Sequence, residues 1–112
     1  MGTDELILSQ AQELRRGTVV LACLTLLEEP RYGYALLETL GEAGIAVDGN
    51  TLYPLLRRLE KQGLLVSEWN TGQSRPRKFY SISPDGARVR TGLLREWRAL
   101  DASIARLTRG DR

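Results

Sequence analysis

Apolar residues recur at helical spacing along the first half of the chain. The pattern predicts a first helix over residues 4–28 and a second that runs to about Ala43, because apolar side chains three and four positions apart share one helix face. Pro30 ends the first helix, since the residue before a proline is forced out of the helical region. Gly17 leaves open whether this stretch is one bent helix or two shorter ones.

A third helix is predicted between Asp48 and Gly63. Either Asp48 or Asn50 can cap it, because both side chains accept hydrogen bonds from free backbone N–H groups. One face is apolar and the other is basic. The apolar stripe consists of Leu52, Leu55, Leu56 and Leu59. Pro54 falls near the first turn or just beyond it. A missing N–H group costs least early in the helix, and a later proline can kink it.

The second half of the chain begins with the pattern of a β-hairpin. Residues 64–69 and 77–82 alternate as strands do, and the stretch 70–76 between them is rich in turn-forming residues. A serine-proline-aspartate sequence then starts a last helix, which is predicted over residues 84–107. The chain therefore reads as three helices, a hairpin and a long helix.

This order predicts a mainly α fold with a small β-hairpin, the winged helix-turn-helix, in which the third helix is the one that reads DNA. With 112 residues there is room for one domain and an appended helix. We predict a winged-helix DNA-binding domain at residues 1–83, with the N-terminal helix included. Residues 84–112 are predicted to form a C-terminal dimerisation helix and tail.

The net charge of +2 hides a segregation of charge along the chain. Residues 1–50 hold 3 basic and 8 acidic residues, a net charge of −5, whereas residues 51–90 hold 8 basic and 3 acidic residues, a net charge of +5. The basic block coincides with the third helix and the hairpin. It favours a polyanionic partner, although a solvated basic face would give the same count.

The composition disfavours enzymes and metal sites. The chain has no histidine and a single cysteine, so it lacks an imidazole base, a His-containing metal site and a thiolate zinc cluster. It also has no phosphate-binding glycine loop and no nucleophilic serine elbow. We predict a protein that is not an enzyme and uses no metal or cofactor. The cysteine, Cys23, lies in the most apolar helix, where inert packing is expected and redox sensing is a minor alternative.

The same composition favours the cytoplasm. No apolar run approaches the roughly 20 residues of a membrane span. The N-terminus carries Asp4 and Glu5, where a signal peptide would be positively charged. A single cysteine forms no internal disulfide, which fits a reducing compartment. We predict a cytoplasmic protein with no membrane partner.

Four segments resemble a known family. They are Leu14-Arg15-Arg16-Gly17-Thr18, Arg31-Tyr32-Gly33-Tyr34, Gly49-Asn50-Thr51-Leu52-Tyr53-Pro54-Leu55-Leu56-Arg57-Arg58-Leu59-Glu60 and Arg75-Pro76-Arg77-Lys78-Phe79-Tyr80. Over about residues 12–107 the chain resembles the PadR family of bacterial transcriptional regulators, and the third and fourth segments are the specific part of this match. The resemblance implies a homodimer that represses promoters and is often released by a small molecule. The short, single-helical C-terminal part looks like the compact subgroup.

The third helix carries candidates for DNA contact, because hydroxyl, amide, phenol and guanidinium groups near a helix start can reach phosphates or base edges. They are Asn50, Thr51, Tyr53, Pro54 and Arg57. The alternative for Asn50 and Thr51 is that they only cap the helix, and for Asn50 this is as plausible as contact. Tyr53 can instead cover the core, but the resemblance favours DNA contact for it. Pro54 can pack against a sugar or a thymine methyl, or simply shape the helix.

The hairpin supplies basic candidates that would lie over the minor groove or the flanking phosphates. They are Arg75, Arg77 and Lys78. A solubilised turn is the alternative, which the charge segregation disfavours. Tyr32 is a further candidate, because it begins a helix whose N-terminus can accept a phosphate. Alternatively, Tyr32 or Tyr34 is a plain core or helix-staple residue, which is the preferred interpretation for Tyr34. Trp69 is expected to belong to the core.

The last helix has an apolar stripe that so small a domain cannot bury by itself. A partner helix from a second subunit would cover it, and the first helix can join through Leu6, Leu8 and Leu14. The predicted interface residues are Leu93, Trp97, Leu100, Asp101 and Ile104. Two copies of Trp97 could clamp a flat aromatic ligand, although tryptophan is more commonly a plain interface anchor. Asp101 could orient a cationic ligand, but a pair with Arg98 or another surface arginine is the stronger expectation.

These features predict a sequence-specific DNA-binding transcriptional regulator. It is expected to be a dimeric repressor that binds a palindromic operator on double-stranded DNA and is released by a small aromatic ligand. The alternative is a winged-helix module that binds another protein and does not recognise a DNA sequence.

Overall fold

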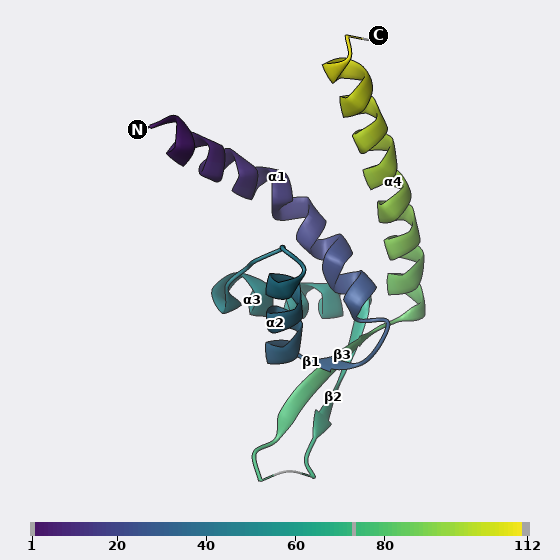
Figure 1. The fold of residues 1–112 in the computed structure, drawn as a ribbon. Coiled ribbons are helices and arrows are strands. Elements are labelled where there is room, and N and C mark those ends of the chain that lie inside the picture. The colour runs from purple at the N-terminus through teal and green to yellow at the C-terminus, as the bar shows by residue number, and fades with distance from the viewer. Residues whose placement is uncertain (1, 73, 111–112) are drawn as a thin grey trace.

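The structure, a computed structural model, describes residues 2–72 and 74–110. Its elements are α1 (Thr3–Leu26), β1 (Arg31–Tyr32), α2 (Gly33–Glu42), α3 (Gly49–Lys61), β2 (Leu65–Asn70), β3 (Arg77–Ile82) and α4 (Pro84–Thr108). The predicted fold class is confirmed: the described chain is mainly helical and has one small antiparallel sheet (Figure 1). The hairpin of β2 and β3 projects from the helices as a wing.

The sheet has one strand more than the sequence predicted. β1 pairs antiparallel with β3, which places Arg31 opposite Tyr80 and Tyr32 opposite Phe79 and gives the order β1-β3-β2. A two-residue strand is too short to show alternation, so the pattern assigned it to the approach to the second helix. The extra strand joins the start of α2 directly to the wing.

α1 is a single helix that runs through Gly17, which settles the choice between one helix and two. Only its C-terminal part is buried, from Val19 onward, and its first half extends away from both the domain and α4 (Figure 1). The two helices diverge from a common base. The first half of α1 and the outer half of α4 therefore form two arms that are largely exposed to solvent. Across the described residues no helix is both long and apolar enough to cross a membrane.

The core lies where α1, α2, α3 and the sheet meet. Its buried residues are Val19, Cys23, Leu24, Leu27, Leu36, Leu40, Leu52, Leu55, Leu56, Leu59, Leu65 and Tyr80. Cys23 is fully buried, and burial raises the pKa of its thiol to about 12. The thiol therefore stays protonated at neutral pH, which agrees with the packing role and disfavours redox sensing.

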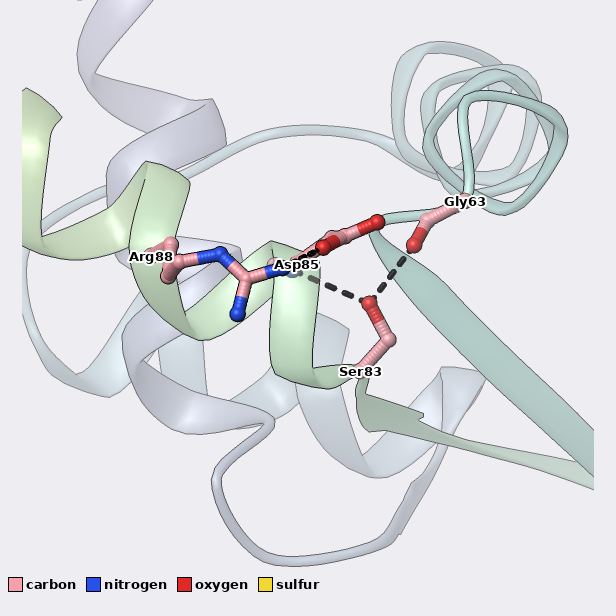
Figure 2. Close-up of polar contacts among 5 residues, drawn as sticks. Gly63, Ser83, Asp85 and Arg88 are labelled. Carbon is pink, nitrogen blue, oxygen red and sulfur yellow. Dashed lines mark hydrogen bonds and ion pairs between the residues drawn. The ribbon is translucent and has the colours of Figure 1, made fainter.

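The start of α4 is fixed against the end of α3 by Ser83 (Figure 2). The Ser83 hydroxyl accepts a hydrogen bond from the Gly86 N–H at 2.9 Å and donates one to the Gly63 carbonyl at 2.6 Å. Asp85 follows in the first turn and pairs with Arg88. The predicted serine cap is confirmed, and it also links two helices that lie apart in the sequence.

Candidate nucleic-acid interface

The third helix presents its polar face away from the core, as expected for a helix that reads DNA. Its four leucines are buried, whereas Asn50, Thr51, Tyr53, Pro54 and Arg57 are exposed or lie at the border of exposure. The cap is the Asp48 carboxylate, which accepts a hydrogen bond from the backbone N–H of Thr51 at 2.9 Å. Asn50 lies inside the helix and does not cap it.

Pro54 lies inside α3, just beyond its first turn, which is within the predicted range. Its ring leaves the carbonyl four residues earlier, that of Asn50, without an intrahelical donor. This carbonyl is on the exposed part of the helix, where water or a ligand can satisfy it. Pro54 therefore adds an exposed apolar surface near the helix start.

Tyr53 is positioned by two glycines. A Cβ atom on Gly33 would lie 2.7 Å from Cε1 of the Tyr53 ring, and one on Gly49 would lie 3.0 Å from Cε2. The ring therefore fits between the starts of α2 and α3, in space that exists only because both residues lack a side chain. Since 36% of Tyr53 remains exposed, its packing still leaves part of the ring and hydroxyl open to a partner.

The wing is joined to the start of α2 by aromatic residues. The Tyr32 and Tyr34 rings stack with 5.8 Å between centroids, and Tyr32 meets Phe79 edge to face. The Tyr32 hydroxyl accepts a hydrogen bond from the Asn70 amide at 2.7 Å. Arg77 donates to the Tyr34 hydroxyl at 2.9 Å and lies over its ring. Tyr32 and Arg77 thus help to hold the wing against the start of α2, and both side chains remain partly exposed to solvent.

Lys78 is held by α3 rather than projecting freely. Its ammonium group lies 3.2 Å from a carboxylate oxygen of Glu60, and the other Glu60 oxygen accepts a hydrogen bond from the Ser67 hydroxyl. The Ser67 hydrogen bond and the Lys78 charge lower the pKa of the Glu60 carboxyl below its usual range. The Glu60 carboxylate therefore ties both wing strands to α3 and offsets the charge of Lys78.

We expect Glu60→Gln to destabilise the protein at neutral pH and to have little effect in acid. A carboxyl whose pKa is lowered by folding stabilises the fold above its unfolded pKa, and this contribution is lost as the pH falls through its folded value. Melting temperatures of both proteins, measured from neutral to acid pH, should converge at the acid end. Glu68→Gln, at an exposed carboxylate on β2, is the control. An equal, pH-independent loss in Glu60→Gln would contradict the proposed role.

Five of the nine predicted DNA-contact residues line one hollow between α3 and the wing, with a volume of about 450 Å³. They are Tyr32, Tyr53, Arg75, Arg77 and Lys78. Asn50 and Arg57 are exposed elsewhere on α3. Thr51 and Pro54 instead line a separate groove of about 920 Å³ between α1 and α3, together with Arg15, Arg16 and Arg58.

Two residues of the hollow are more exposed than predicted: Trp69, expected in the core, and Tyr34, expected in the core or as a helix staple. Trp69 is 62% exposed and Tyr34 is 49% exposed, and both line the hollow. Burial was inferred from residue type, because aromatic side chains are usually inside. The position of Trp69, directly before a turn-forming stretch, is the feature of the sequence that indicates its exposure. The end of a strand next to a turn extends past the core.

The outer half of α4 carries the predicted interface. Trp97, Leu100 and Ile104 are exposed, whereas Leu93 packs partly against the core of its own protomer and is less available to a partner. Asp101 is exposed, and the ion pairs found among residues 2–72 and 74–110 do not include it, so the expected pair with an arginine is not present. α1 presents Leu6, Leu8 and Leu14 in the same exposed manner.

Comparison with characterised proteins places this chain in a family. Residues 20–91 match the model of the transcriptional regulator PadR-like family. A PadR family transcriptional regulator from Eggerthella lenta is 48% identical, with 94% of each chain covered and a TM-score of 0.90. A transcriptional regulator from Clostridium thermocellum is 28% identical, with 84% of this chain and 96% of that chain covered and a TM-score of 0.77.

A curated relative, the transcriptional regulator Rv3488 of Mycobacterium tuberculosis, is 41% identical over 70 residues. The match covers 62% of this chain and spans 63% of the length of that relative. The resemblance read from the four sequence segments is therefore confirmed by the family model and by the similar folds. The chain belongs to the PadR-like family of transcriptional regulators.

Proposed function

We propose that this protein regulates transcription by binding double-stranded DNA through α3 and the wing. The observation that carries the proposal is the hollow in which Tyr53 of α3 faces the wing residues Arg75 and Arg77. Such a surface offers a phenol near a helix start for base or phosphate contact and guanidinium groups for flanking phosphates. The net charge of +5 over residues 51–90 supports a polyanionic partner.

We propose that the protein acts as a homodimer on a palindromic operator. The arms formed by α1 and α4 leave Leu8, Leu14, Leu100 and Ile104 mostly exposed to solvent. Apolar side chains on projecting helices are stabilised when helices of a second copy cover them. A two-fold dimer would present two α3 helices to two half-sites. Residues 1–83 would then be the DNA-binding part and residues 84–112 the dimerisation part.

Repression and release by a small aromatic compound complete the proposal. A dimer bound over a promoter blocks access to it, and such a regulator acts where the chromosome is, in the cytoplasm. Trp97 is 46% exposed in the middle of the α4 stripe, with Asp101 one turn further on. In a dimer two Trp97 side chains could therefore hold a planar ligand between them, with Leu93, Leu100 and Ile104 as the apolar surroundings.

The test is fluorescence anisotropy with DNA from upstream of the protein's own gene and with random DNA. We expect tight binding to the upstream DNA at physiological salt, two chains bound per operator, and log K falling with log salt by about 0.9 for each phosphate contacted. Planar aromatic compounds that release the operator in the same assay would identify the effector. Equal, salt-sensitive binding to both DNAs would contradict sequence-specific regulation and favour the protein-interaction alternative.

A further inference from the structure

Trp69 is exposed to a degree that packing within the protomer does not explain. It is the second-last residue of β2, and 62% of it is open to solvent. Among the described residues no other aromatic ring or cation stacks on the indole. A large apolar side chain left in water forgoes the stabilisation that burial would give, so its position favours a partner that covers it.

The indole points to the side of the sheet that faces the recognition helix. Ser67 and Trp69 are two residues apart on β2, so their side chains lie on the same face. Ser67 donates a hydrogen bond to Glu60 of α3, which identifies that face. Trp69 therefore lies on the face of the sheet that packs against α3, and it lines the same hollow as Tyr53 and Arg75.

We propose that Trp69 is a further DNA-contacting residue, whose indole lies against the sugars and base edges of the groove beside the wing. This inference rests on the proposed function, and it adds an apolar component to a surface described so far by its charges. Duplex DNA offers both parts of a complementary surface: phosphates for Arg75 and Arg77, and the apolar faces of deoxyribose and bases for the indole.

The two components differ in how they respond to salt. Contacts between cations and phosphates release counterions, so they set the slope of log affinity against log salt. An indole that covers sugar and base edges adds affinity without releasing counterions. A variant that lacks the indole should therefore bind more weakly at every salt concentration with the same slope, whereas Arg75→Ala should reduce the slope.

The experiment measures operator affinity by anisotropy at several salt concentrations for the parent, Trp69→Ala, Trp69→Phe and Val66→Ala. We expect Trp69→Ala to bind about tenfold more weakly with an unchanged salt slope, and Trp69→Phe to lose less because it keeps a ring. Val66 is the matched control, because it is 49% exposed on the opposite face of β2. Val66→Ala should bind as the parent does.

Tryptophan emission gives a second, independent measurement. Operator DNA should change the emission of the parent, and this change should disappear in Trp69→Phe, where Trp97 is the remaining tryptophan. Parental affinity in a folded Trp69→Ala protein would overturn the inference while leaving the proposed function intact. A parent that selects no DNA sequence would instead overturn the proposed function, and this inference with it.

Discussion

Tyr53→Ala is expected to lose at least about thirtyfold in operator affinity while still melting cooperatively, since truncation of a central contact costs roughly 2 kcal/mol or more. The ring lies between Gly33 and Gly49 at the start of α3, where the fold fixes its direction before DNA arrives. A side chain that is already held loses little conformational freedom on binding, so its contacts contribute fully. Anisotropy with the operator measures the affinity, and thermal melting shows that the variant is folded.

Two further variants separate the parts of the Tyr53 side chain. Tyr53→Phe keeps the packing on the glycines and removes only the hydroxyl, so it should lose up to about tenfold. Gly33→Ala leaves Tyr53 in place chemically but puts a methyl group 2.7 Å from its ring, so it should weaken binding by displacing the ring. A folded Tyr53→Ala protein with parental affinity would rule out this surface as the recognition surface.

Gly86→Ala is expected to cause the largest loss of stability of any single methyl addition considered. The new Cβ would lie 2.1 Å from the carbonyl oxygen of Leu64 and 2.7 Å from the Ile82 side chain. The Leu64 carbonyl cannot move freely, because it accepts a hydrogen bond from the Ser83 N–H at 3.1 Å. We expect destabilisation by about 3 kcal/mol and a melting temperature lower by roughly 10 to 25 °C.

Gly41→Ala is the matched control for this change. Gly41 is also helical, but a Cβ there meets no atom within 4 Å. Alanine should therefore stabilise the protein by roughly 0.5 kcal/mol, because it restricts the unfolded chain. Circular dichroism melts of the three proteins make the comparison. Similar melting temperatures for Gly86→Ala and the parent would show that α4 can shift away from the sheet at little cost.

The sequence was sufficient to predict the fold because its signals are local and repeated. The leucine stripe of α3 and the serine cap before Pro84 are written in consecutive turns of helix, and the alternation of residues 77–82 marks β3. The structure confirms these elements. Five DNA-contact candidates also line one hollow. Four of them lie on the third helix and the basic hairpin, and each of these elements was predicted from its own segment of the sequence.

What the sequence did not reveal depends on contacts between distant residues. The pair of Lys78 with Glu60 joins residues 18 positions apart, and the Asn70–Tyr32 hydrogen bond joins residues 38 apart. The spacing of apolar and polar residues along the chain does not indicate which distant side chains will pair. The exposure of Trp69 was missed for a related reason: whether a strand residue is covered depends on where the overlying helix ends, which is a property of the assembled fold.

The two-residue strand β1 has a consequence for how bound DNA could be released. It continues directly into α2 while pairing with β3 (Figure 1). The hydrogen bond between Arg77 and the Tyr34 hydroxyl adds a second connection. We therefore expect the wing and the start of α2 to move together. In the proposed dimer, a ligand bound near Trp97 would then act by rotating one protomer relative to the other. The two α3 helices and their wings would no longer match successive turns of the double helix.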